Sequence, residues 1–176
     1  MLKGKNIFLR ALEPSDIEPL YQWENDPLVW KVSNTYAPWS RHVLEEYILS
    51  SHQDIYVSKQ VRMVICETKT TKPVGCIDLF EFDPNNLRAG IGIIVNSADR
   101  KSGFADDALG VMINYCFSTL NLHQVFCNIS SSNEGSIRLF EKHGFIKCGV
   151  KKEWNRISNG FEDEFLYQLL SLRKFV

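Results

Sequence analysis

At residue 61 the hydrophobic pattern changes its period, and this change narrows the choice of fold more than any other feature of the chain. Three runs rich in β-branched and other apolar residues follow, over 61–67, 74–82 and 87–95. The segments between them, Thr-Lys-Thr-Thr-Lys-Pro and Asp-Pro-Asn-Asn, have the composition of turns. Short strands separated by such turns are typical of an antiparallel meander. The middle of the chain is therefore expected to form a three-stranded antiparallel sheet.

The residues before the meander are expected to hold one strand and two helices. A short apolar run predicts the strand over 7–12. Ser15, followed three residues later by Glu18, has the spacing of a capping box and predicts a helix that ends at Asn-Asp-Pro. The aromatic segment 28–39 is expected to be a loop, and a second helix is expected to begin at Ser40.

After the meander the pattern alternates between helix and strand. We expect a helix over 103–120, a strand over 125–129, a helix over 133–143, and two hairpin strands over 147–156 and 161–170. A strand–helix–strand unit places two strands parallel in one sheet. The sequence therefore predicts a single domain over residues 1–176 with an α/β (α+β) fold, in which a mixed sheet carries helices on both faces.

The charge composition excludes two classes of partner. Lys and Arg number 20 and Asp and Glu 21, which gives a formal net charge of −1. Proteins that coat nucleic acid or an anionic membrane need a surplus of positive charge, so neither partner is expected. No apolar run approaches the roughly 20 residues that span a bilayer, and the first residues lack the apolar core of a signal peptide. We therefore expect a cytoplasmic protein.

The five cysteines and four histidines are scattered along the chain. They form no CxxC, HExxH or similar spacing, so no metal site is expected. The cysteines lie in apolar stretches, where cysteine usually serves as a small core residue. No cysteine stands in a Cys/His arrangement that would favour a covalent acyl-enzyme.

The segment 91–105 carries the clearest chemical signal. A buried strand ends there, and a loop with Arg100, Lys101 and Gly103 leads directly into a helix. A helix start offers unpaired N–H groups and a positive dipole, and glycine lets an anion approach the backbone. These features fit a pyrophosphate cradle, although the spacing is neither the P-loop nor the dinucleotide fingerprint. An ordinary strand-to-helix connection with solvated charges would have the same local pattern.

Two motifs in this half of the chain resemble those of one known superfamily. Arg100-x-x-Gly103-x-Ala105 is similar to the Q/R-x-x-G-x-G/A acetyl-CoA loop of the GNAT N-acetyltransferases. Residues 133–145 resemble the later signature N-x-x-[AS]-x-x-x-[YF]-x-K-x-G-F, in the family's order. Leu9-Arg10-x-Leu12-x-x-x-Asp16 and Asn159-Gly160-x-x-x-Glu164 resemble the branch that holds spermidine/diamine and ribosomal-protein acetyltransferases. The resemblance covers nearly the whole chain.

This resemblance implies a GNAT-like sheet, mostly antiparallel, whose parallel strand pair is splayed, and acetyl-CoA as co-substrate. The splayed strand would bind the pantetheine arm and polarise the thioester carbonyl through backbone N–H groups. The loop before the next helix would hold the pyrophosphate. The residues implied are Ile93, Ile94 and Val95 for the arm, Arg100, Lys101, Ser102, Gly103, Phe104 and Ala105 for the pyrophosphate, and Asn133, Ser136, Phe140 and Lys142 from the second motif.

The sequence departs from the family pattern at the two usual proton carriers. Phe140 stands where many relatives have a tyrosine acid, and Gly90 stands where a glutamate is common. A thiol leaves with a pKa of about 8.5, so an acid is less necessary than for an alkoxide. Asp78 and Glu81 match acidic positions of polyamine-acetylating relatives and are candidate water-mediated bases; a solvated strand edge is the alternative for both.

The acceptor is less well defined. Residues 28–44 contain no Asp or Glu, which argues against a polycation. They contain Trp30, Tyr36 and Trp39, which suit a cleft for a small amine or a peptide N-terminus, and Glu24 at the end of the first helix could face the same cleft. The alternatives are that the aromatic residues only pack the loop onto the core and that Glu24 is simply exposed.

Together these features predict an enzyme that transfers an acetyl group from acetyl-CoA to a primary amine by direct attack in a ternary complex. The competing prediction is a binding module that keeps acyl-CoA with little or no turnover, which the Phe140 and Gly90 departures make worth testing. Homo-oligomerisation is left open by the sequence.

Overall fold

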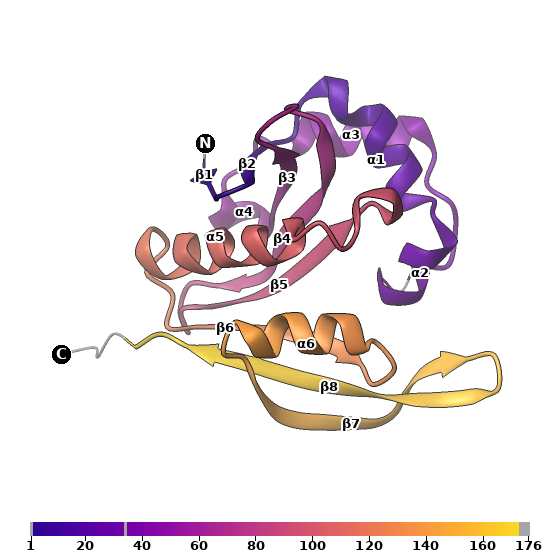
Figure 1. Ribbon diagram of the computed structural model, residues 1–176, viewed down its shortest axis with the longest axis vertical. Helices are drawn as coiled ribbons and strands as arrows, with labels where there is room; N and C mark the ends of the chain where they lie inside the picture. Colours follow the sequence, from indigo (N-terminus) through magenta and orange to yellow (C-terminus); the bar gives the residue numbers. More distant parts are fainter. Residues whose placement is uncertain (1, 34, 173–176) are drawn as a thin grey trace.

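The computed structural model describes residues 2–33 and 35–172. Eight strands form one sheet in the order β1-β2-β3-β4-β5-β6-β8-β7 (Figure 1). Its strands are β1 (Leu2–Lys3), β2 (Ile7–Ala11), β3 (Val61–Glu67), β4 (Pro73–Asp83), β5 (Arg88–Val95), β6 (Gln124–Ser130), β7 (Ile146–Ile157) and β8 (Gly160–Leu170). All neighbours are antiparallel except β5 and β6. The predicted meander and the single parallel pair are both confirmed.

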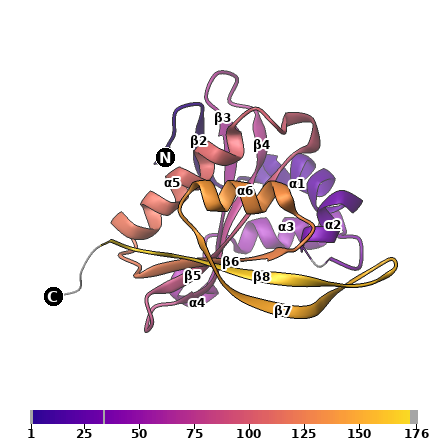
Figure 2. The ribbon, with the colours of Figure 1, turned by 60° about the horizontal axis from the view of Figure 1, so that its bottom comes forward.

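Helices cover both faces of this sheet, as expected. They are α1 (Ile17–Glu24), α2 (Pro27–Ser33), α3 (Arg41–Ser50), α4 (Ile55–Ser58), α5 (Phe104–Ser118) and α6 (Glu134–Lys142). Figures 1 and 2 show α5 and α6 side by side on one face and α1 and α3 on the other. In the part of the chain described here, no helix is both long and apolar enough to cross a membrane.

The two cores follow from the two-residue period of the strands. On β2, Ile7 and Leu9 are buried with α5, whereas Phe8 packs against the core formed with α1 and α3. On β3, Ile65 belongs to the first core and Val64 to the second. Successive side chains of a strand point to opposite faces, so a strand covered on both faces is apolar at nearly every position.

The start of the first helix differs from the prediction. The chain enters α1 through a short 3₁₀ turn, and the Asp16 carboxylate accepts a hydrogen bond of 2.8 Å from the Glu13 N–H. The capping contact therefore joins Glu13 and Asp16 rather than Ser15 and Glu18. Glu18 instead lies on the helix surface, where it pairs with Arg41 at 2.6 Å.

The segment predicted as a loop over 28–39 begins with a helix, α2. Pro27 occupies its first position, and the Leu28 N–H donates to the Asp26 side chain at 2.9 Å. Aspartate before a proline is a regular way to begin a helix, because the side chain satisfies a free N–H and proline needs no partner. The prediction of a loop was therefore wrong, because the Asp26-Pro27 helix start acts locally whatever the aromatic composition of the residues that follow. The short helix α4 was not predicted either.

The parallel strands β5 and β6 stay paired only at one end. Their ladder runs from Arg88 opposite Gln124 to Gly90 opposite Phe126. Beyond Gly90, β5 stays paired with β4 as far as Val95, and β6 continues to Ser130. Over these residues β5 and β6 no longer pair with each other. The expected splayed pair is therefore present, and its open end positions the site described next.

Candidate active site

A cavity of about 300 Å³, here called the gap cavity, lies where β5 and β6 part. Its walls include the open ends of both strands, and α2, α6 and the β7–β8 hairpin also contribute. Figures 1 and 2 place α2 and the tip of the hairpin on the same side of the molecule. The side chains with most chemical interest in its lining are Arg62, Asp78, Asn128, Ser136, Phe140 and Glu164.

A second cavity of about 450 Å³, here called the loop cavity, lies at the start of α5. It shares Ile93, Ile94, Asn133 and Ser136 with the gap cavity, so the two are neighbouring parts of one cleft. Ten of the residues that the resemblance implied for acetyl-CoA line it: Ile93, Ile94, Val95, Arg100, Lys101, Gly103, Phe104, Ala105, Asn133 and Ser136.

Three implied residues lie elsewhere. Ser102 belongs to the same loop but is outside the lining of the loop cavity. Phe140 lines the gap cavity instead. Lys142, at the end of α6, pairs with Asp106 of α5 at 2.8 Å, and hydrogen bonding from Lys142 lowers the pKa of Asp106. In this arrangement Lys142 is outside the lining of the loop cavity but joins α6 to Asp106 of α5, which is part of that lining.

The loop before α5 has the geometry of an anion cradle. Gly103 caps the helix in the left-handed conformation, with φ of +79°, and a Cβ added there would meet no atom within 4 Å. The N–H groups at the start of this fifteen-residue helix have no partner within its own turns. The Arg100 Nε donates to the Val95 carbonyl at 3.1 Å, which holds its guanidinium beside the end of β5. Open space, N–H donors and two cations fit the pyrophosphate of acetyl-CoA.

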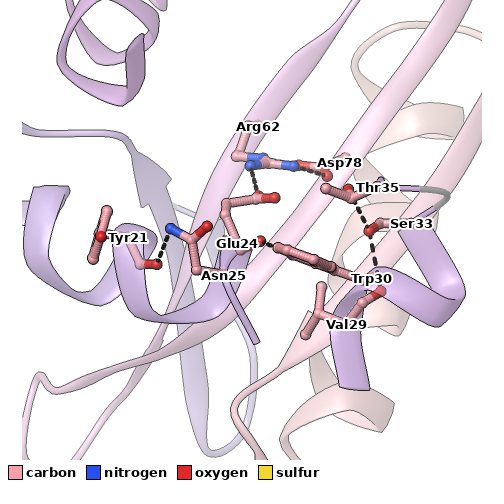
Figure 3. Close-up of polar contacts among 9 residues, drawn as sticks. All are labelled: Tyr21, Glu24, Asn25, Val29, Trp30, Ser33, Thr35, Arg62 and Asp78. Carbon is pink, nitrogen blue, oxygen red and sulfur yellow. Dashed lines mark hydrogen bonds and ion pairs between the residues drawn. The ribbon is translucent and has the colours of Figure 1, made fainter. Parts of the chain in front are cut away.

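One wall of the gap cavity is an ion-pair cluster (Figure 3). The Arg62 guanidinium donates to both oxygens of Asp78, at 2.7 and 2.8 Å, and a further nitrogen donates to Glu24. Burial opposes the charge of Arg62, but the Asp78 and Glu24 carboxylates still hold its pKa well above the usual range. Glu24 is thus buried rather than exposed. Sequence reasoning missed Arg62, because only the pairing of β3 with β4 brings it to Asp78.

The opposite wall holds a second carboxylate that the sequence predictions did not assign to the site. Glu164 of β8 is buried, and one of its oxygens accepts a hydrogen bond from Lys151 at 2.7 Å. The other oxygen is 3.3 Å from the Asn155 amide. The motif around Asn159-Gly160 contained Glu164 and was a signal for it, but the structure was needed to bring it opposite Asp78.

The two departures from the family pattern, Phe140 and Gly90, are both closely packed. Phe140 is buried and packs edge-on against Phe145, with ring centroids 5.0 Å apart. At Gly90, an added Cβ would lie 2.3 Å from the Phe80 ring. Phe80 therefore occupies the space that a longer side chain at residue 90 would need, and it lines the gap cavity itself.

Glu81 does not reach this site. It lies in an irregular part of β4, where the register with β5 shifts between Phe80 and Asp83, and its φ is +50°. This bulge turns Glu81 toward a different cavity, which it shares with Asp83 and Arg88. Glu81 therefore lies outside the gap cavity, contrary to the prediction that it is a base at this site.

The three aromatic residues predicted to line an acceptor cleft do not line either cavity. The Trp30 indole donates to the Glu24 carbonyl at 2.6 Å and so fastens α2 to the end of α1 (Figure 3). Tyr36 is 86% exposed, and Trp39 is partly exposed with its backbone bonded to Asn25. The aromatic lining of the gap cavity comes instead from Phe80 and Phe140. Within 2–33 and 35–172, no cluster of His, Cys, Asp and Glu could hold a metal ion.

Comparisons with known proteins agree with this geometry. The family model for an acetyltransferase (GNAT) domain matches residues 6–146. The chain is 26% identical to the probable N-acetyltransferase YjcK of Bacillus subtilis, over 97% of both chains. It is 24% identical to the spermidine N(1)-acetyltransferase of Vibrio cholerae, over 91% of this chain and 90% of that protein.

A solved structure shares the fold. The crystal structure of spermidine N-acetyltransferase from Vibrio cholerae in complex with CoA and spermine has a TM-score of 0.85 to this chain at 24% identity, covering 94% of this chain and 95% of that one. With a family match over most of its length, the splayed strand pair and full-length relatives named as N-acetyltransferases, this chain belongs to the GNAT family and is an N-acetyltransferase.

Proposed function

We propose that the protein transfers an acetyl group from acetyl-CoA to a primary amine, which attacks the thioester directly in a ternary complex. The observation that carries this proposal is the parting of β5 and β6 beyond Gly90, where the gap cavity meets the loop cavity. The loop cavity carries Arg100, Lys101 and helix N–H groups, together with Asp99 and Asp106. The gap cavity carries the carboxylates of Asp78 and Glu164, together with Arg62. This arrangement suits a phosphate-bearing donor and an amine acceptor that meet in the middle.

Acetyl-CoA, when bound, supplies the activated acetyl thioester. The loop from Arg100 to Ala105 would hold its pyrophosphate, and backbone groups of Ile93 to Val95 would hold the pantetheine arm. The β5 groups that point toward β6 have no ladder partner there beyond Gly90 among the described residues. Such groups need another partner, and a backbone N–H at this point can stabilise the negative charge that develops on the carbonyl oxygen.

The chain must also remove a proton from the attacking ammonium. We propose Glu164, acting through water, as the base, because only one of its oxygens is held by a cation, Lys151. Asp78 is the second candidate, but Arg62 holds both of its oxygens. Phe140 has no proton to give, and the thiolate leaves without an acid at that position.

A second candidate function follows from the same Phe140. A GNAT-fold module that binds acyl-CoA with little or no turnover would keep the loop cavity and lose the proton carriers. One experiment separates the two: release of free thiol from acetyl-CoA is measured with a panel of small amines, polyamines, amino acids and peptides. We expect acceptor-dependent release. Tight CoA binding without release for any acceptor would instead establish the binding module.

We also propose that the protein assembles with copies of itself. One structural neighbour is a dodecameric structure of spermidine N-acetyltransferase from Vibrio cholerae, with a TM-score of 0.79. In this chain Ile146, Trp154 and Phe161 of the β7–β8 hairpin are 59–73% exposed. Apolar side chains of this size on one hairpin are a regular feature of protein interfaces. Analytical ultracentrifugation tests this, and a monomer at micromolar concentration would contradict it.

A further inference from the structure

The side chain of Arg62 is held from three directions. Asp78 on the neighbouring strand β4 accepts two hydrogen bonds from it, and Glu24 at the end of α1 accepts a third (Figure 3). On α3, the Tyr47 ring lies 5.5 Å from the guanidinium carbon. Burial raises the pKa of Tyr47 to about 12, so the ring remains neutral beside the cation. Arg62 is therefore a fixed part of the cavity wall rather than a mobile surface cation.

This cluster lies beside the open strand. Arg62 faces Asp78 across the β3–β4 ladder, and Asp78 in turn faces Gly92 on β5, next to Ile93. Both Arg62 and Asp78 line the gap cavity. An acceptor amine that reaches the open part of β5 would thus have this cluster within reach of its far end.

The cluster already contains its own cation. Two partly buried carboxylates need a positive charge, because removing them from water without one is costly. Arg62 provides that charge: its fork occupies both Asp78 oxygens and one oxygen of Glu24. A second ammonium at the far end of an acceptor would have to compete with the Arg62 guanidinium, which three hydrogen bonds hold, for both oxygens of Asp78 and one oxygen of Glu24.

Resting on the proposed function, we propose that Arg62 restricts the acceptor to an amine with one positive charge, because it occupies the position where Glu24 and Asp78 would otherwise bind a second ammonium. Arg62 is thus a specificity-determining residue. The acceptor class is a monoamine, or a peptide N-terminus with no neighbouring cation.

The test uses two probes that differ only in the second ammonium, butylamine and 1,4-diaminobutane. In the unmodified protein, the ratio of kcat/KM for diamine over monoamine should lie below about two, the value that two equally reactive ends would give without any discrimination. In Arg62→Gln this ratio should rise at least roughly tenfold, the effect of one added charge-assisted hydrogen bond. Arg62→Lys keeps the cation and should restore the low ratio. Arg138→Gln makes the same change at an exposed ion pair on α6 and should leave it unaltered.

A second variant keeps the proposal testable if Arg62→Gln does not fold. Arg62→Gln leaves two carboxylates without a cation, whereas Arg62→Gln with Glu24→Gln restores the original net charge of the cluster and still frees Asp78. Its ratio should also rise, by at least severalfold. A ratio above about two in the unmodified protein would overturn the proposal. So would a ratio in either folded variant that stays within twofold of the unmodified protein's ratio.

These outcomes are distinct from a failure of the proposed function, which would show as no thiol release with either amine. In that case the same two amines, compared by calorimetric binding, give the corresponding ratio for the unmodified protein and its variants. Equal discrimination by the unmodified protein and by Arg62→Gln would then overturn the role of Arg62.

Discussion

Replacing Gly103 with valine should separate the acetyl-CoA site from the stability of the fold. Gly103 has φ of +79° and lines the loop cavity, and a Cβ there meets nothing within 4 Å. The Cβ of the new residue therefore causes no clash inside the protein. Its effects come from backbone strain and from new atoms placed beside the helix N–H groups.

The strain can be estimated from the backbone alone. A β-branched residue held in the left-handed region costs about 1–3 kcal/mol. For a chain of this length each kcal/mol lowers Tm by about 2–4 °C. Loss of one hydrogen bond between a backbone N–H and a charged pyrophosphate costs about 1.5–3 kcal/mol, so Kd for CoA should rise roughly ten- to a hundredfold.

Calorimetric titration with CoA and thermal unfolding measure the two effects separately. Gly160→Val is the control, because Gly160 also has positive φ (+133°) and open space for a Cβ but is the first residue of β8, next to the β7–β8 turn. It should lower Tm and leave the affinity for CoA unchanged. If Gly103→Val bound CoA within twofold of the unmodified protein, or if both variants lost affinity equally, the loop would not be the pyrophosphate site.

Three further changes test other parts of the molecule. Glu164→Gln should lower kcat for amine-dependent thiol release at least roughly a hundredfold at neutral pH, the usual worth of a general base; a loss of less than threefold would remove Glu164 from that role. Phe140→Tyr should change kcat by less than about threefold, because a thiolate needs little assistance, and a tenfold increase would show that proton supply limits the reaction. The pKa of Asp106 is lowered mainly by hydrogen bonding from Lys142, so its stabilisation is present above the unfolded pKa near 3.9 and is lost as pH falls through the lower folded value. In Asp106→Asn the free energy of unfolding should therefore fall less steeply as the pH is lowered below about 4. The variant should lose no more than about 1 kcal/mol at neutral pH, because the pair is partly exposed. The same dependence on acid pH in both proteins would contradict this.

The strands and the later helices were predictable because their signals are local. The run from Val61 to Glu67 has the same bounds in the structure as in the prediction. Asn133 caps α6 by accepting from the Ser136 N–H at 3.2 Å, as its position before an amphipathic segment indicates. Periodicity and capping act over three or four residues, so they can be read from the chain directly.

Some local signals in the sequence conflict with each other. Asp26-Pro27 marks the start of α2, but the aromatic residues after it suggested a loop. The bulge at Glu81 has no sequence mark, since it depends on how β4 and β5 pair. Its position moves Glu81 away from the site, because a shift in strand register carries a side chain to a different place on the sheet.

The sequence by itself determined the order of the longer strands and helices, the loop from Arg100 to Ala105 and, through its motifs, the family. Only the tertiary structure brought together the ion-pair cluster of Arg62, Asp78 and Glu24 beside the gap cavity. Arg62 lies 38 residues from Glu24 and 16 from Asp78 along the chain, and β3, β4 and the end of α1 bring all three together. An ion pair between distant residues leaves no periodic or spacing signal, because it depends on the packing of whole elements and not on neighbours in sequence.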